Sequence, residues 1–327
     1  MPLLLAWRAT CRDHYGDVAT ELRHSVLGLV SPFVPDPGAL MSLTIRFGAI
    51  IIGEAALTYV LRDSNPTFVP STLEISVGSI MFNSFMKDFR LLPGATAVIE
   101  SINLIPHPTP FVCQRQIKQT AEIRLRSGRH ILIRESVSIS PCSPLAGSWT
   151  SALMNFVTFH SFGCAYPRLT LFRRGLLCGV RGDVSSSWDE EIAERMEVFS
   201  FKFGTSWSDL PPLEGTDRCP WVPGNDGCGR SIYVCPNQGR YFGDAGSLVV
   251  LNDVLNISTD FLFARRVAPY GTMVAWRLPS QGLCEGQCDN ADELLPPEAV
   301  ILLLRMMKGQ TNTTNRYNTQ RRRSLSL

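Results

Sequence analysis

Arginine side chains alternate with aliphatic ones on both sides of Gly128, and guanidinium groups suit the binding of phosphate. A three-residue loop at Ser127, Gly128 and Arg129 predicts a hairpin, because glycine adopts the positive φ of a bulged turn. This register places Leu125 opposite Ile131 and Ile123 opposite Ile133. The opposite face then carries Arg124, Arg126, His130 and Arg134. Such a face favours binding of a polyanion, and a solvated outer face of an antiparallel sheet is the competing interpretation.

A second basic group ends the chain, where two serines accompany three arginines. The residues are Arg321, Arg322 and Arg323, followed by Ser324 and Ser326. Arginines of this kind neutralise phosphates without reading sequence, and phosphorylation of the serines would cancel part of the charge. A merely solubilising tail is the alternative. The expected partner of both basic groups is single-stranded RNA.

The second half of the chain holds a group of cysteines among glycines and prolines: Cys219, Cys228, Cys235, Cys284 and Cys288. Thiolates bind zinc tetrahedrally, so one interpretation is a structural zinc site. The spacings lack the short Cys-x2-Cys pairs typical of such sites, so free thiols and disulfides stay open as alternatives. We expect no other cofactor.

Signatures of common enzyme classes are absent. The sequence has no phosphate-binding loop, dinucleotide fingerprint, His-Glu-x-x-His motif or Gly-x-Ser-x-Gly elbow. We therefore expect a protein without enzymatic activity or small-molecule substrate. An enzyme with scattered site residues is an alternative, and its sign would be a polar pocket around His107, Cys113 and His130.

Composition restricts the function further. Hydrophobic residues make up 45% of the 327 residues, which is ample for real cores, and the net charge is only +2. Any affinity for nucleic acid must therefore come from local patches. Arginines supply 27 of the 31 cationic side chains, a bias that compact viral genomes also produce. No apolar run reaches the about 18 to 20 residues of a membrane span, and no signal peptide is evident.

Hydrophobic patterning predicts mostly strands. The expected helices cover residues 15–30, 188–197 and 297–307. The expected strands cover residues 43–53, 56–61, 73–82, 95–104, 117–125, 130–139, 152–161, 168–180, 248–254 and 272–278, with a further one at Phe199, Phe201 and Phe203. Prolines and glycines mark most of the intervening turns.

These elements predict a mostly β fold: an antiparallel, jelly-roll-like β-sandwich with a second β-rich module and a few short helices. We expect four parts. They are an N-terminal helical extension at residues 1–40, the sandwich at 41–182, a cysteine-containing β-rich module at 183–308, and a disordered tail at 309–327.

Three segments within residues 43–85 resemble the core of the thirty-kilodalton movement-protein superfamily of plant viruses. They are a hydrophobic run with Gly48, a run ending in Leu61-Arg-Asp63, and Gly78 before an aromatic-rich stretch. By this resemblance Asp63 is the motif aspartate, and Gly48 and Gly78 are the strand-associated glycines. The resemblance implies a β-sandwich that binds single-stranded nucleic acid, associates with membranes and carries viral genomes between cells.

Together these observations predict a viral protein of the host-cell cytoplasm or cell periphery that binds single-stranded nucleic acid, as in cell-to-cell movement. The runner-up is a self-assembling capsid or matrix subunit, in which sheet edges are buried against neighbouring copies. The sequons at Asn256 and Asn312 permit a secreted disulfide protein, and the missing signal peptide argues against it.

Overall fold

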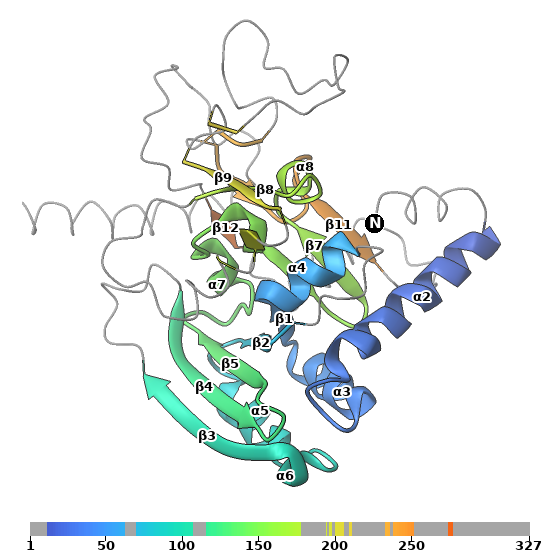
Figure 1. Cartoon of the computed structure of the whole chain (residues 1–327), viewed down its shortest axis with the longest axis vertical. Coiled ribbons are helices and arrows are strands. Elements are labelled where there is room, and N and C mark those ends of the chain that lie inside the picture. The colour runs from blue at the N-terminus through green and yellow to red at the C-terminus, as the bar shows by residue number, and fades with distance from the viewer. Residues whose placement is uncertain are drawn as a thin grey trace, which may run out of the picture.

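One large mixed sheet of eight strands organises the chain (Figure 1). The computed structural model describes residues 12–62, 70–106, 116–177, 194, 196–197, 200–205, 209–210, 233–235, 238–251 and 274–276. The strand order is β11 (Leu248–Leu251), β7 (Ser161–Cys164), β6 (Asn155–Val157), β1 (Ile50–Ile52), β2 (Thr72–Val77), β5 (His130–Ser136), β4 (Ile117–Leu125) and β3 (Ile99–Pro106). Neighbouring strands are antiparallel except β2 and β5, which are parallel. The fold is therefore mostly β with some helices.

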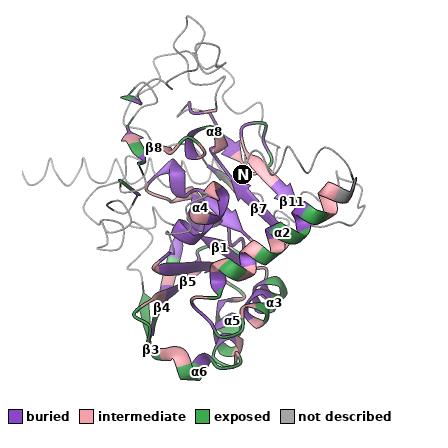
Figure 2. Cartoon of the chain, turned by 45° about the vertical axis from the view of Figure 1, so that its right-hand side comes forward, coloured by how far each residue is buried: buried purple, intermediate pink, exposed green. Residues whose placement is uncertain are grey.

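Helices cover one face of this sheet and build the main core with it. They are α2 (Arg12–Val30), α3 (Pro37–Phe47), α4 (Gly53–Leu61) and α5 (Phe82–Phe89). Alternate residues of β2, namely Leu73, Ile75 and Val77, point into this core and are fully buried. Figure 2 shows the buried residues concentrated on the sheet and on the inward sides of these helices. Burial of this aliphatic surface is the dominant stabilising term.

Smaller elements surround the β1 and β6 part of the sheet. On the opposite face, Leu145 of α7 (Ser143–Ala146) packs against Ile50 and Ile52 of β1. The other small elements are the 3-10 helix η2 (Ser151–Leu153), α8 (Pro167–Thr170), and two small sheets formed by β8 (Arg174–Leu176) with β9 (Lys202–Gly204) and by β10 (Arg240–Tyr241) with β12 (Ala275–Trp276). A short helix, α6 (Ala95–Val98), precedes β3. The strands described form no second large sheet, and a jelly-roll sandwich is not confirmed.

Two expected strands are helices, and those predictions were wrong. Residues 43–47 belong to α3, because the Asp36 side chain accepts a hydrogen bond from Ala39 N at 2.9 Å and Pro37 suits the first helical turn. Gly48, with φ of 60°, ends that helix in the left-handed conformation. Residues 56–61 belong to α4. Of the predicted strand at 43–53, only β1 remains.

Elsewhere the secondary-structure predictions were better. The first helix was confirmed as α2, the strands at 117–125 and 130–139 as β4 and β5, and parts of seven further strands as β2, β3, β6, β8, β9, β11 and β12. The start of the strand predicted at 168–180 is instead the helix α8. The predicted strand at 73–82 ends at Val77, and the helix α5 that follows was missed. The helix predicted at 297–307 lies outside the described residues, as does most of the one at 188–197.

Two observations concern the boundaries of the predicted domains. Apolar residues of α2, including Leu22 and Val26, belong to the main core. Strand β11 comes from the predicted second module, yet it pairs with β7 at one edge of the large sheet. Among the described residues, no helix is long and apolar enough to cross a membrane.

Candidate nucleic-acid interface

The β4–β5 hairpin has the predicted faces with a different register. Leu125 N–H donates to Arg129 O at 2.9 Å, and Arg124 pairs with His130, so the loop is residues 126–128 instead of 127–129. Gly128 has the expected positive φ, 80°. Ile123 therefore lies opposite Ile131, and the predicted pairing with Ile133 was wrong. The shift is an even number of residues, so it leaves each side chain on its predicted face.

The dry face of the hairpin is as predicted: Ile123, Leu125, Ile131 and Ile133 are all buried in the main core. On the other face Arg124 and Arg126 are exposed. Within the described residues neither side chain has a hydrogen bond or an ion pair. These two arginines are therefore accessible to an anion. The tail residues Arg321, Arg322 and Arg323 lie outside the described residues.

The other two members of the predicted basic face have acidic neighbours. Arg134 Nη2 lies 2.6 Å from Glu74 Oε2, and the two side chains are only 12% and 6% exposed. His130 Nδ1 lies 3.6 Å from Glu122 Oε1. Since β2 and β5 are parallel neighbours, Glu74 is brought to the face that carries Arg134. The charge of Arg134 is balanced inside the protein, which removes it from the accessible basic surface.

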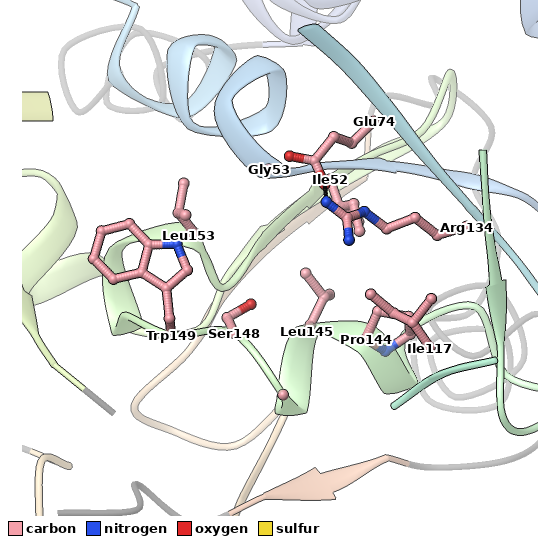
Figure 3. A pocket seen from close by; sticks show the side chains of 11 residues that line it. Ile52, Gly53, Glu74, Ile117, Arg134, Pro144, Leu145, Ser148, Trp149 and Leu153 are labelled. Carbon is pink, nitrogen blue, oxygen red and sulfur yellow. Dashed lines mark ion pairs between the residues drawn. The ribbon is translucent and has the colours of Figure 1, made fainter. Parts of the chain in front are cut away.

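A small cavity of about 40 Å³ adjoins this buried ion pair (Figure 3). Glu74 and Arg134 lie on one side of it, and Leu145, Ser148 and Trp149 lie across from them. A cavity volume of this kind admits a water molecule once it exceeds about 10 to 15 Å³, so this cavity is large enough for water and too small for a nucleotide.

Gly53 forms the wall of the cavity at the start of α4. Its φ is 69°, and a Cβ atom there would overlap the Glu74 carboxylate. The carboxylate thus lies at the N-terminus of a nine-residue helix, where the helix dipole favours negative charge. A protein carboxylate already occupies this position, and its ion pair with Arg134 joins β2 to β5 beside the start of α4.

A larger hollow of about 420 Å³ lies between α5 and the strands β3 and β4. We call it the α5 groove. Its lining combines four apolar side chains with two cations and two amides: Phe82, Met86, Leu91 and Leu104; Lys87 and Arg90; Asn83 and Gln119. This volume lies within the range of small-molecule sites, about 300 to 1,000 Å³.

The cations of the α5 groove are accessible. Lys87 and Arg90 are exposed, and within the described part of the chain neither side chain forms an ion pair. The acidic residue of the same helix, Asp88, is bound to Arg46 at 2.8 Å. Gln119 Nε2 donates to Glu135, whose charge is also balanced by Lys118 at 2.7 Å. The groove therefore presents two uncompensated positive charges above an apolar floor.

Sequence reasoning missed the α5 groove because residues 78–82 were assigned to a strand and no element was expected at residues 83–89. A signal was present: Phe82, Phe85, Met86 and Phe89 recur at intervals of three and four, which is the period of an amphipathic helix. All four are buried.

The structure describes only one cysteine of the candidate zinc site. Cys235 is buried, and the other four cysteines of the candidate zinc site lie outside the described residues. Within the described ranges, no three side chains of His, Cys, Asp or Glu are grouped so as to hold a metal. Desolvation by burial raises the pKa of Cys142 and of Cys164 from 9.0 to about 12, which leaves these thiols protonated at neutral pH and unsuited to nucleophilic attack.

The remaining candidate residues have structural roles or lie outside the described ranges. Gly48 ends α3, and a Cβ atom on Gly78 would overlap the Ile139 carbonyl oxygen. Asp63 lies outside the described residues, as do His107 and Cys113 of the alternative enzyme site. The segments of the movement-protein resemblance fold largely as α3, α4 and α5 instead of strands, and the family assignment stays a prediction.

Comparisons with known proteins give one partial structural match. No family model and no curated protein matches the chain. The match is to the CCA-adding enzyme of Thermotoga maritima complexed with tRNA, with 15% identity and a TM-score of 0.29, over 55% of this chain and 42% of that chain. The matched structure is an enzyme, in contrast to the predicted absence of enzymatic activity, and that prediction is withdrawn. A TM-score of 0.29 transfers neither a fold nor an activity.

Proposed function

We propose that the protein binds single-stranded nucleic acid in the α5 groove. The observation that carries the proposal is the pair of exposed, uncompensated cations, Lys87 and Arg90, above an apolar floor. A nucleotide has the matching chemistry, because its base is flat and largely apolar while its phosphate is anionic. A positively charged groove with apolar contact surface is the general arrangement for binding a single strand without sequence preference.

The polar side chains of the groove suit this ligand. Asn83 is exposed. The amide N–H of Gln119 donates a hydrogen bond to the Glu135 carboxylate, which leaves the Gln119 amide oxygen as an acceptor. Amides hydrogen-bond to base edges of any sequence, since each base has donors and acceptors. Leu91 and Leu104 are 73% and 54% exposed, so their surface is available for apolar contact with a base.

The experiment is a fluorescence-anisotropy titration of the full chain with a labelled single-stranded RNA over a series of salt concentrations. Two phosphate contacts predict a slope of log affinity against log salt of about −1.4 for a single strand. Lys87→Gln with Arg90→Gln should remove this slope and most of the affinity. Leu91→Ser should weaken binding several-fold and leave the slope unchanged, because it removes apolar contact and no charge.

The matched control is Arg124→Gln with Arg126→Gln, which removes the same charge from the hairpin. Retained affinity in this variant, together with loss in the groove variant, supports the proposal. Loss in the hairpin variant alone would place binding at the site expected from sequence and refute the groove. Equal loss in both would indicate binding spread over the surface.

The narrower roles in viral movement and in a capsid or matrix stay predictions.

A further inference from the structure

Strand β3 is a terminal strand of the large sheet, and within the described residues its only partner is β4. A terminal strand presents a row of backbone N–H and C=O groups that another strand can bind. Proteins usually protect such edges with charged residues, prolines or β-bulges. In β3 these features lie at its ends, with Glu100 and a register shift at one end and Pro106 at the other, so the stretch Ser101-Ile-Asn-Leu-Ile105 between them has none. Leu104 and Ile105 are 54% and 42% exposed. The edge therefore has the features of a surface that pairs.

The sequence of β3 is complementary to itself in the antiparallel direction. If two copies pair about Asn103, Ile102 of one copy lies opposite Leu104 of the other, on the face that also carries the core residue Ile123. The two Asn103 amides face each other, and each offers a donor and an acceptor. Both cross-strand Ile–Leu pairs then extend the apolar side of the sheet.

The charges permit the same arrangement. Glu100 is the acidic residue of β3, and in this register it lies opposite Pro106 of the other copy. The two Glu100 residues are then at opposite ends of the paired strands, roughly 20 Å apart, so they do not repel each other strongly.

We propose that β3 pairs with β3 of a second copy of this chain, so that two eight-stranded sheets become one continuous sheet about a twofold axis at Asn103. The occupant is a second copy because the pattern of β3 is complementary to an identical strand. A single pair of strands buries less surface than a standard interface, about 1,600 Å² in total, so the dimer is expected to be weak and dependent on concentration.

Sedimentation equilibrium of the full chain over a range of concentrations tests this. The wild type should shift from monomer to dimer as concentration rises. Ile105→Lys should be monomeric throughout, because it adds a charge to the edge. Ile80→Lys is the matched control, since Ile80 is 63% exposed and lies in the turn after β2, away from the edge. Circular dichroism should show that both variants are folded.

A monomeric wild type at every concentration would overturn the proposal, and so would equal dissociation by the two lysine variants. Open polymers in place of dimers would also contradict it, because they indicate pairing of β3 with the other terminal strand, β11, in a head-to-tail contact. Capture of a peptide without self-association would assign the edge to a different partner.

The register has its own test. Asn103→Cys places two cysteines directly opposite each other on the axis, at a separation that permits a disulfide. Oxidation should give more cross-linked dimer for this variant than for Ser101→Cys or the wild type, and equal yields would refute this register. Ile105 does not line the α5 groove, so nucleic-acid binding by Ile105→Lys measures the proposed function separately.

Discussion

Replacing Glu74 by Gln should destabilise the protein more than any other single removal of a carboxylate charge from the sheet. The Glu74 carboxylate and the Arg134 guanidinium are 2.6 Å apart and buried to 94% and 88%. Within the described residues Glu74 is the hydrogen-bonding or ionic partner of Arg134, and Arg134 Nε is buried without one. Glutamine keeps the size of the side chain and removes its charge. Arg134 would then be a nearly buried cation without a counterion.

The expected cost follows from the burial of the pair. Two unit charges about 4 Å apart attract by about 4 kcal/mol at an effective dielectric constant of about 20. Removing one partner of a buried pair typically costs about 3 to 5 kcal/mol, because the other charge stays desolvated. Removing both charges is often neutral. We therefore expect a loss of about 3 kcal/mol in the free energy of unfolding for Glu74→Gln, and recovery of most of it when Arg134→Met is added.

Urea denaturation followed by circular dichroism measures these values. The matched control is Asp88→Asn, which makes the same acid-to-amide change in an ion pair of similar length, 2.8 Å, with an Arg46 side chain that is 71% exposed. Exposed pairs contribute about 0 to 1 kcal/mol, so the control should change little. A cost below about 1 kcal/mol for Glu74→Gln, or a double variant less stable than the single one, would refute the reasoning.

Two further predictions concern the glycines and thiols. Gly53→Ala and Gly128→Ala both place a side chain at positive φ, which costs about 1 kcal/mol, but only Gly53→Ala also displaces the Glu74 carboxylate. The urea midpoint of Gly53→Ala should therefore fall clearly further than that of Gly128→Ala. Equal midpoints for the two variants would contradict the cavity geometry. Cys142 and Cys164 keep their protons in the folded state up to a pKa of about 12, whereas the unfolded thiols lose them near 9.0. Their contribution is therefore complete below pH 9.0 and declines by about 1.4 kcal/mol per pH unit per thiol as the pH approaches 12. A Cys142→Ala, Cys164→Ala variant should show a shallower decline in the unfolding free energy, and an identical decline would exclude this effect.

The faces of the β4–β5 hairpin could be predicted, and its register could not. Alternation of arginine with aliphatic residues assigns each side chain to a face, and that assignment was confirmed. A loop at 126–128 and a loop at 127–129 give strand registers that differ by two residues and place every side chain on the same face, so the alternation cannot distinguish the two loops. The hydrogen bond from Leu125 N–H to Arg129 O shows that the loop is 126–128.

The sequence contains signals for the helix α3, which was predicted as a strand. Asp36, Pro37 and Gly48 are start and stop signals for α3, whereas the expected element here was a strand beginning at residue 43. The β-branched residues that follow favoured a strand. Tertiary burial outweighs this preference, since α3 packs its apolar side into the main core.

The Glu74–Arg134 pair lies beyond what the sequence pattern predicts. It depends on parallel pairing of β2 with β5, in which Thr72 lies opposite His130, 58 positions later (130 − 72). Alternation within a strand identifies the face of each residue and says nothing of which strand lies beside it. The basic face expected from the hairpin alone therefore included an arginine whose charge is compensated from a distant segment.

The place of β1 in the sheet has a consequence during synthesis. One side of β1 pairs with β2, and the other side pairs with β6, where Ile51 lies opposite Val157. The ribosome adds about 5 to 20 residues per second, so the 106 residues between these positions (157 − 51) take roughly 5 to 20 s. For that time the nascent chain presents an uncapped, entirely aliphatic strand, Ile50-Ile-Ile52, at the centre of the later sheet. Translation speed between β1 and β6, and the chaperones that bind this strand meanwhile, should therefore influence how much of the protein reaches its native state.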